Sequence, residues 1–320
     1  MPTAAPLRRR RPEVVVAVVS WNTRELLAGA LAALQGDVRA GRAEVWVIDN
    51  ASVDGSAQMV RERFGWVHLI ASPTNPGFGA AVNVVAAATR AVGAPWLAVA
   101  NADTAVASDA LAALLEAGRA DPRAGALAPA LRLPDGSLQH SVHPFPSIGV
   151  ALVLALGLAR IRPGLGETLT LDGRWERRVG RRVAWAHGAF LLVRRDAFDA
   201  VGGFDPHQFL YAEDLDLAWR LHRAGWHSRY VPEALVDHVH AAAISQLYGE
   251  ARDARALQSA YTWLHRRRGP VVPVLWAGVN AAGAGLRGLA PGSRAAGSRR
   301  QARLHLRALA AARRSAGRTV

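Results

Sequence analysis

Three acidic residues lie within four positions of residues 209–220, FLYAEDLDLAWR, between apolar and aromatic neighbours. On a helix, Glu213, Asp216 and Arg220 would share one face, because residues three and four apart are neighbours on a helix surface. Asp214 would point about a quarter-turn away, and we expect its carboxylate to face a cavity. The alternative is a purely structural helix start, where the helix dipole favours acids and an Arg forms a salt bridge. This segment alone does not decide between the two.

The elements that would position these acids follow a βαβ order. Residues 13–20 form a continuous run rich in β-branched residues, which is typical of a strand buried on both faces of a parallel sheet. A helix is predicted next, capped by Asn22 or Thr23 and running through Leu34. Further strands are predicted at 44–48, 67–71, 96–100, 183–194 and 229–231, with helices at 108–119 and 299–314. The predicted fold class is therefore α/β, with an open, mostly parallel sheet and helices on its faces.

Polar residues fall at several carboxyl ends of these strands, which is where open α/β sheets bind their ligands. A dinucleotide fold of the oxidoreductase type is disfavoured, because the first turn has no glycine fingerprint, and no P-loop is present. The residues expected to converge on one crevice are Ser20, Trp21, Asn22, Asp49, Asn101, Ala102 and Asp103.

Each of these motifs has a structural and a chemical interpretation. Asp49 opens a loop, where its carboxylate could accept the imide N–H of a uracil or thymine ring, although an Asx-turn is the commoner use of such a residue. Asp103 could bind a divalent cation, with Asn101 as a neutral oxygen ligand, or could simply form a turn. Hard oxygen ligands with open positions suit Mg²⁺ or Mn²⁺. His238 and His240 lie two residues apart at a strand end, and one of them could complete this metal site.

Charge is distributed unevenly along the 320 residues. All 39 basic residues are Arg, and the net charge is +14. Four Arg lie in residues 1–12 and 13 in residues 254–320, both without acids, so residues 13–253 hold 22 Arg against 25 acids. Basic ends on a near-neutral body predict contact with an anionic surface, either membrane phospholipid or nucleic acid. Charge is the only feature that supports a nucleic-acid partner, because no basic platform interleaved with aromatic residues is evident. We therefore expect no nucleic-acid partner.

The segments that could meet a membrane are short. No signal peptide is recognised at the N-terminus, and the chain is expected to be cytoplasmic. The apolar residues 148–159 are too few to span a bilayer, and residues 269–286 are interrupted by Pro270, Pro273 and Asn280. We therefore expect the basic extension to bind the inner face of the plasma membrane peripherally, with 269–286 in apolar contact and an Arg stripe on the headgroups. The stripe consists of Arg299, Arg303, Arg307 and Arg314.

Taken together, the motifs resemble those of family 2 glycosyltransferases with the GT-A fold. The matching pieces are VVSWN at 18–22, VIDNASVDGS at 47–56, NPGFGAAVN at 75–83, NAD at 101–103, HGAF at 187–190, GGFD at 202–205 and EDLD at 213–216. The match covers about residues 13–245. DGS at 135–137, FP at 145–146 and the run at 209–216 are most similar to bacterial rhamnosyltransferases of cell-envelope glycan synthesis.

The resemblance implies a transfer reaction and assigns residues to it. It places Asp49 on the base of a nucleotide sugar, Asp103 and His238 on Mn²⁺ or Mg²⁺, and Asp214, with Glu213 beside it, as the general base of an inverting reaction. The metal motif departs from relatives that carry two acids or Asn-Pro-Asp there, and the spacing of the histidines leaves His240 as an alternative to His238. The implied donor-binding residues are Ser20, Trp21, Asn22, Asp49, Asn75, Gly79, Asn83, Asn101 and Ala102, and the implied acceptor-binding residues are His187, Gly188 and Trp219.

These inferences give the expected organisation and partners. Residues 1–12 are a basic tail, 13–250 a GT-A domain, and 251–320 a helical, Arg-rich extension. The implied partners are a dTDP- or UDP-sugar donor, a glycan or polyprenyl-linked acceptor, and an anionic membrane surface. The alternative functions are a catalytically idle relative that only binds a sugar nucleotide or glycan, and a nucleic-acid-binding protein that uses its basic ends.

Overall fold

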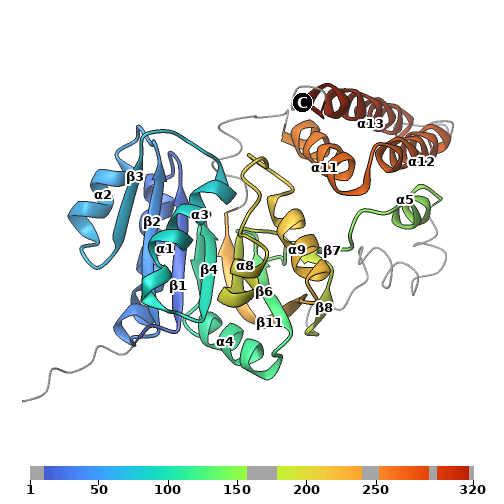
Figure 1. The fold of residues 1–320 in the computed structure, drawn as a ribbon. Coiled ribbons are helices and arrows are strands. Elements are labelled where there is room, and N and C mark those ends of the chain that lie inside the picture. The colour runs from blue at the N-terminus through green and yellow to red at the C-terminus, as the bar shows by residue number, and fades with distance from the viewer. Residues whose placement is uncertain (1–10, 157–178, 240–251, 288–293, 317–320) are drawn as a thin grey trace, which may run out of the picture.

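The computed structural model describes residues 11–156, 179–239, 252–287 and 294–316. A central sheet with helices on both faces is followed by three long helices packed together at one end of the molecule (Figure 1). The expected α/β architecture with a helical C-terminal extension is confirmed.

The N-terminal half is the parallel βαβ unit that the sequence predicts. Its strands run parallel in the order β3-β2-β1-β4. Its elements are β1 (Val14–Ser20), α1 (Arg24–Arg39), β2 (Ala43–Asn50), α2 (Ser56–Arg63), β3 (His68–Ser72), α3 (Phe78–Ala88), a 3-10 turn η1 (Arg90–Val92) and β4 (Trp96–Asn101).

The second half makes the sheet mixed. After β4 the order continues β10-β6-β11-β5, and β10 runs antiparallel to both of its neighbours, whereas β6 and β11 are parallel. The elements are β5 (Thr104–Val106), α4 (Ala110–Ala120), β6 (Ala124–Arg132), β7 (Val142–His143), α5 (Ile148–Ala155), β8 (Arg181–Val183), β9 (Trp185–Ala186), β10 (Phe190–Arg194), α8 (Arg195–Ala200), α9 (Glu213–Arg223) and β11 (His227–His238).

The prediction of one strand over residues 183–194 is wrong. The chain turns at Ala184 and again at 187–189, so that three short strands form with separate partners: β8 pairs with β11, β9 with β7, and β10 with β4 and β6. The second turn brings the backbone N–H of Gly188 to α9.

Strands β6 and β11 each contain a proline, and the sequence does not predict their full length. β6 contains Pro129, and β11, expected only over 229–231, extends through Pro232 to His238. Pro129 pairs with Val231, next to a register shift between Val231 and Leu235. A proline cannot donate a ladder hydrogen bond, so it is tolerated where a strand pair is irregular.

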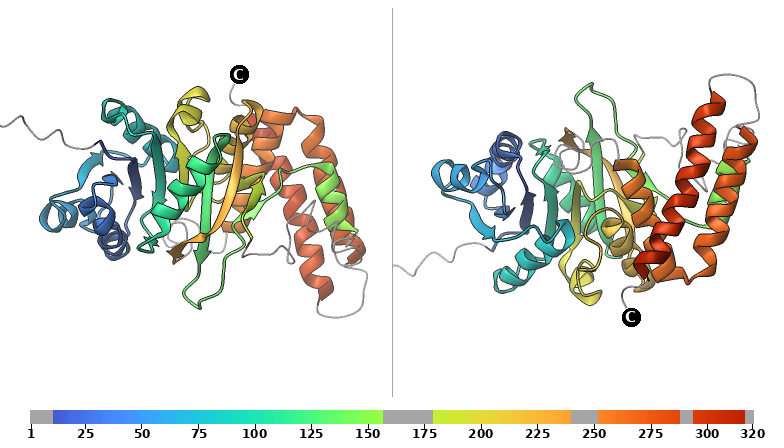
Figure 2. Two further views of the ribbon diagram at one scale, coloured as in Figure 1. Left: turned by 90° about the horizontal axis from the view of Figure 1, so that it is seen from below. Right: turned by 90° about the horizontal axis from the view of Figure 1, so that it is seen from above.

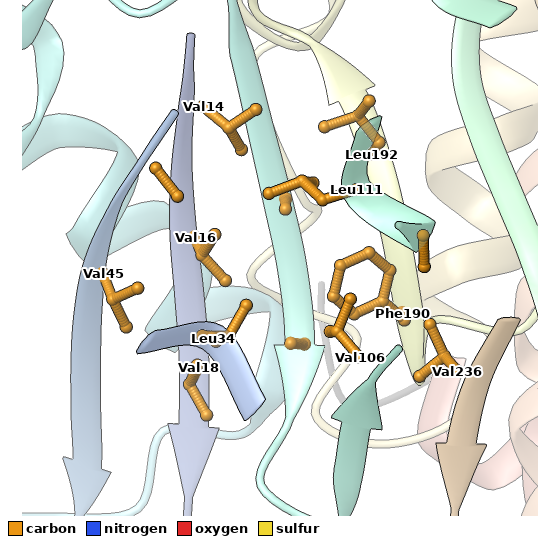
Figure 3. Packing of buried hydrophobic residues seen from close by; sticks show 14 of the residues in the cluster. Val14, Val16, Val18, Leu34, Val45, Val106, Leu111, Phe190, Leu192 and Val236 are labelled. Atoms are coloured by element: carbon orange, nitrogen blue, oxygen red, sulfur yellow. The ribbon is translucent and has the colours of Figure 1, made fainter. Parts of the chain in front are cut away.

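Both faces of the sheet are buried, as the β-branched run of β1 requires. Val14, Val16 and Val18 face one hydrophobic cluster, which α1, α2 and α4 cover (Figure 3). Val15 and Ala17 face a second cluster, under α3, α8 and α9. Strands covered in this way cannot shift in register without exposing apolar side chains, so the carboxyl ends of β1, β2 and β4 are held in fixed positions.

The C-terminal extension is a bundle of α11 (Arg252–Arg268), α12 (Val271–Arg287) and α13 (Arg294–Ala316), with α5 lying along α12 (Figure 2). Tyr261 is fully buried in the bundle and its hydroxyl lies 2.9 Å from His305 Nδ1. At Gly283 a Cβ atom would come within 2.5 Å of the Ala155 Cβ, so the small side chain permits close packing of α5 on α12. Among the described residues no helix combines the length and apolarity needed to cross a membrane.

The extension is joined to the sheet domain through Asp216 of α9, which is completely buried. Its carboxylate accepts hydrogen bonds from Arg220 at 2.7 Å, from Arg267 at 2.6 Å and from the Trp263 indole N–H at 3.1 Å. The predicted Asp216–Arg220 contact is therefore present. Two arginines and an indole satisfy a charge that would otherwise be costly to bury.

Candidate active site

A pocket of about 500 Å³ lies at the carboxyl ends of β1, β2 and β4, bounded by the start of α9, the end of β11 and α11. Ten of the residues expected to act in binding or catalysis line it. They are Trp21, Asn75, Asn101, Ala102, Asp103, His187, Gly188, Glu213, Asp214 and His238.

Asp103 and His238 face one another across this pocket. Asp103 Oδ1 lies 3.5 Å from His238 Nε2, and both side chains are almost fully buried. The pairing of β11 with β5 places His238 opposite Thr104, and the backbone N–H of Val239 donates to the Asp103 carbonyl at 3.0 Å. His240, the alternative ligand, lies outside the described residues.

This pair fits a divalent cation that a substrate helps to hold. A carboxylate oxygen and an imidazole nitrogen are ligands that Mn²⁺ accepts, and Mg²⁺ is usually held by one or two protein carboxylates together with substrate phosphates. Within the described residues no three His, Cys, Asp or Glu side chains gather closely enough to hold a metal by themselves. Asp103 and His238 by themselves would leave most coordination positions of such a cation open to oxygen atoms of a substrate or of water.

Asp214 lies at the start of α9 with its carboxylate directed into the pocket. The backbone N–H of Gly188 donates to Oδ2 at 2.9 Å, and that of Leu215 donates to Oδ1 at 2.7 Å. Burial raises the pKa of Asp214, while these two N–H groups act to lower it. A half-buried carboxylate held by backbone donors beside a cavity is suited to accept a proton from a bound hydroxyl group.

Glu213 lies beside Asp214 and is 9% exposed. Burial, with a further contribution from the Asp214 charge, raises the pKa of Glu213 to about 8. Glu213 Oε2 has no hydrogen-bond partner among the described residues, whereas Asp214 accepts two N–H groups. Within this pair the backbone donors favour the charged form of Asp214, so Glu213 is the better site for the proton and Asp214 the better site for the negative charge.

Replacing Glu213 with Gln should remove a loss of stability at high pH. Below pH 4.5, the ordinary pKa of Glu, the side chain is protonated in both the folded and unfolded states, so its burial causes no pH-dependent loss of folding stability. As pH rises from there through about 8, the unfolded state releases this proton more readily, so wild-type stability falls. We expect Glu213→Gln to melt about 3–8 °C above wild type near pH 9 and close to it near pH 5. Exposed Glu62→Gln is the control, and identical pH dependence of all three melting temperatures would contradict this.

Two asparagines and a buried acid lie at the carboxyl end of β2 and in the loop after β3. Asn50 Nδ2 donates to Asn75 Oδ1 at 3.2 Å, and Asn75 Oδ1 also accepts the Gly77 N–H at 3.0 Å. Asp49 is 3% exposed, and its Oδ1 accepts the N–H of Ser52, three residues on, at 3.0 Å, a local turn contact of the kind that the structural interpretation expects. Asp49 Oδ2 is buried with no hydrogen-bond partner among the described residues. One oxygen thus forms the turn and the other has capacity for a ligand donor.

Six of the predicted binding residues, including Asp49, do not line the pocket. Ser20 is buried and lies 3.1 Å from the Thr23 hydroxyl, and Asn22 Oδ1 accepts the Val53 N–H at 2.8 Å. Both therefore brace the loops after β1 and β2. A donor contact through their side chains would require these loops to move.

Gly79, Asn83 and Trp219 have structural contacts instead. A Cβ at Gly79 would lie 2.8 Å from the Phe204 Cβ, and the Asn83 amide bonds both the N–H and the C=O of Phe204 at 2.9 and 2.8 Å. Trp219 packs edge-on against Phe145 and Trp263. Packing and loop attachment account for these contacts, and the roles of the three residues in ligand binding stay predictions.

Backbone strain gathers around the same pocket. Asn22, Ala51, Tyr211 and Ala212 are the described non-glycine residues with positive φ, between 50° and 65°. The left-handed region costs such a residue about 1–2 kcal/mol. Two of them precede α9 directly and two lie in the loops after β1 and β2, so the strain is confined to the segments that shape the site, a distribution typical of functional sites.

The residues that sequence reasoning missed include two side-chain amides of the pocket, Asn50 and Gln139. Asn50 directly follows Asp49 at the end of β2, and its position beside a predicted ligand could have indicated it. Gln139 follows a turn and precedes β7, and no motif distinguishes it.

Comparison with known proteins assigns the family. The Glycosyl transferase family 2 model matches residues 15–202, and the Glycosyl transferase family group 2 model matches residues 165–286. The first match alone covers more than half of the chain. The chain belongs to glycosyl transferase family 2.

Relatives of this family 2 glycosyltransferase include N-acetylglucosaminyl-diphospho-decaprenol L-rhamnosyltransferase of Mycobacterium tuberculosis. It is 41% identical over 207 residues, which cover 61% of this chain and 66% of the relative, just under two thirds of its length. Rhamnosyltransferase WbbL of Escherichia coli is 50% identical over 50 residues, 16% of this chain and 19% of the relative. The expected resemblance to rhamnosyltransferases is confirmed.

Solved structures confirm the GT-A fold of the family 2 chain. Mannosyltransferase PcManGT of Pyrobaculum calidifontis, in complex with GDP-Man and Mn²⁺, superposes with a TM-score of 0.58 at 19% identity over 95% of this chain and 86% of its own. GalNAc-T7 with UDP, GalNAc and Mn²⁺ gives a TM-score of 0.53 at 16% identity over 71% of this chain and 44% of its own. At these identities the likeness concerns the fold.

Proposed function

We propose that this chain is an inverting rhamnosyltransferase that transfers L-rhamnose from dTDP-rhamnose to a hydroxyl group of a polyprenyl-linked or cell-envelope glycan. The observation that carries the proposal is that one pocket contains both the base candidate Asp214 and the metal-ligand candidates Asp103 and His238. The 41% identity to a mycobacterial rhamnosyltransferase supports the choice of sugar and of a lipid-linked acceptor.

The residues would divide the reaction between them. Asp214 takes the proton from the acceptor hydroxyl as its oxygen bonds to the anomeric carbon, while the bond from that carbon to the nucleoside diphosphate breaks and the diphosphate leaves with the electron pair. A single displacement of this kind inverts the anomeric configuration. Asp103 and His238 would hold Mn²⁺ or Mg²⁺, which when bound offsets the charge of the departing diphosphate. Asp49 Oδ2 would accept the imide N–H of the thymine ring.

Turnover with defined substrates tests this proposal. Purified protein with Mn²⁺ should transfer rhamnose from dTDP-rhamnose to a polyprenyl-diphosphate-linked N-acetylglucosamine, detected by mass spectrometry of the lipid product. The same lipid without its sugar is the control acceptor. Transfer from a UDP-sugar but not from dTDP-rhamnose would reject rhamnose and retain glycosyl transfer. Binding of donors without any transfer or hydrolysis would favour the idle, ligand-binding relative.

We also propose that the extension holds the enzyme on the inner face of the plasma membrane, where a lipid-linked acceptor is reached. The exposed side of α12 is apolar: Val271, Leu275 and Leu286 are 63%, 52% and 64% exposed. Exposed Arg303 and Arg307 on α13 supply positive charge. An apolar helix face near cationic side chains favours anionic bilayers. Full-length protein should co-sediment with phosphatidylglycerol vesicles, and Leu275→Ser/Leu286→Ser should not; equal sedimentation of both would refute this surface.

A further inference from the structure

Gln139 lies in the pocket on a segment that the backbone holds firmly. Its N–H donates to the Leu131 carbonyl at 2.8 Å, and the adjacent Leu138 forms a β-bridge with Arg132 at the end of β6. The turn at Asp135 and Gly136 closes this hairpin. The side-chain amide of Gln139 is therefore presented to the pocket from a defined position.

This amide joins the two sides of the site. Gln139 Oε1 lies 2.7 Å from His238 Nδ1, and Gln139 Nε2 lies 3.2 Å from His187 Nδ1. His187 Nε2 in turn lies 3.0 Å from His143 Nε2. A continuous path of hydrogen bonds thus runs from His238, which faces Asp103, through Gln139 to His187, the residue directly before Gly188, and on to His143 of β7. The N–H of Gly188 binds Asp214.

The chemistry of the amide determines which nitrogen of His238 carries hydrogen. A carbonyl oxygen only accepts hydrogen bonds, so His238 Nδ1 must be the donor. In the neutral ring Nε2 then carries the lone pair, and Nε2 is the atom directed at Asp103. If the amide were turned over, its NH₂ group would face Nδ1 and the ring hydrogen would move to Nε2, where it would block coordination of a cation.

The NH₂ end of the amide imposes the opposite tautomer on His187. An NH₂ group only donates, so His187 Nδ1 accepts and the ring hydrogen lies on Nε2. That hydrogen can be donated to His143 Nε2 when the His143 ring carries its own hydrogen on Nδ1. Burial lowers the pKa of His143 to about 2, so this ring stays neutral and one of its nitrogens is an acceptor. In the orientation that the amide has in the structure, His238 and His187 therefore carry their hydrogens on opposite ring nitrogens.

We propose that Gln139 is a positioning residue whose amide selects the tautomers of His238 and His187 together. Through His238 it presents Nε2 as a metal ligand, and through His187 it fixes the ring next to the Gly188–Asp214 contact. The role toward the cation rests on the proposed metal-dependent function, whereas the tautomers themselves are a property of the protein without metal. Gln139 thereby couples the donor side of the pocket to the acceptor side.

The protein without metal tests the tautomers directly. With ¹⁵N-labelled histidine, NMR of the wild type should show His238 protonated at Nδ1 and bare at Nε2, and His187 with the reverse pattern. The signals of each ring are assigned with a variant in which that one histidine is replaced. Gln139→Glu presents two accepting oxygens, so His238 should keep its tautomer while His187 gains a hydrogen at Nδ1. Gln139→Leu should leave both rings as tautomer mixtures. Hydrogen on Nε2 of His238 in the wild type would overturn the proposal.

Metal affinity provides the second readout. In titrations of Mn²⁺ in the presence of dTDP, followed by electron paramagnetic resonance, Gln139→Leu should weaken Mn²⁺ binding about 10–100-fold, the usual effect of losing a partner of a metal ligand. Gln139→Glu should stay within about threefold of wild type, as should Gln58→Leu, a surface control bonded to Glu62. Wild-type affinity in Gln139→Leu would overturn the role toward the cation. If the wild type binds no Mn²⁺, the metal-dependent function fails, and the metal-free spectra still decide the tautomers.

Discussion

Replacing Asp214 with Asn should lower the rate of sugar transfer by about 10²–10⁴-fold, the range that general base catalysis contributes. The amide oxygen can still accept the Gly188 N–H, which lies 2.9 Å from Oδ2 in the wild type, whereas the amide NH₂ group cannot accept the Leu215 N–H that bonds to Oδ1. The contact between the loop and α9 is thus retained at one of its two bonds. The amide cannot take a proton from the acceptor hydroxyl at neutral pH. Turnover gives the loss, and calorimetry with dTDP should give a dissociation constant within about threefold of wild type.

Asp214→Asn also removes one negative charge from the enzyme, and a second variant controls for that change. Asp109 is an exposed acid before α4 and makes no side-chain capping bond. Asp109→Asn should transfer sugar at the wild-type rate. A wild-type rate in Asp214→Asn, measured beside this control, would exclude Asp214 as the base, and a loss of dTDP binding would show that the substitution damaged the pocket instead.

Removing the cation or its carboxylate ligand should have the second large effect. Chelation with EDTA should abolish transfer by the wild type, and Mn²⁺ or Mg²⁺ added back should restore it. Asp103→Ala leaves His238 as the sole remaining member of the pair, so transfer should fall by about 10²-fold or more even with saturating Mn²⁺, because the negative charge of the departing diphosphate is poorly offset. The measurement is the rate against Mn²⁺ concentration.

Asp237 offers a matched control one residue away from His238. Its carboxylate points to the surface, where it pairs with Arg132 at 2.5 Å and is 47% exposed. Asp237→Ala should keep a wild-type response to Mn²⁺. Transfer that is indifferent to EDTA, together with an active Asp103→Ala enzyme, would refute a metal-dependent mechanism.

The parts of the site that sequence analysis located are those with local signals. The β-branched run of β1 fixed the first strand, and strand ends in a parallel sheet must meet at one edge, so Asp103 could be placed near the pocket without coordinates. Asp214 followed from helical periodicity, because only its spacing separated it from Asp216 and Arg220. The motif resemblance then placed His238 in the same predicted site as Asp103 and Asp214.

The parts that sequence analysis missed depend on contacts between distant residues. Gln139 bonds to residues 48 and 99 positions away, and nothing in its neighbourhood indicates either partner. Asn83 was assigned to a ligand because it belongs to a motif, but its amide bonds Phe204, 121 positions away. The break of the strand over 183–194 likewise arises because its three short strands pair with different strands far away in the sequence, and local propensity does not indicate those partners.

The burial of Asp216 gives the C-terminal helices a structural role besides the proposed attachment to a membrane. A chain cut near residue 250 would lose both Arg267 and Trp263, and the Asp216 carboxylate in the first turn of α9 would keep only Arg220 of these three donors. Removing partners of a buried ionic group is destabilising. The boundary suggested by composition is therefore a poor place to shorten this protein. Both parts of the chain complete the surroundings of α9, and an inactive truncated form would report a damaged α9 as readily as a lost membrane contact.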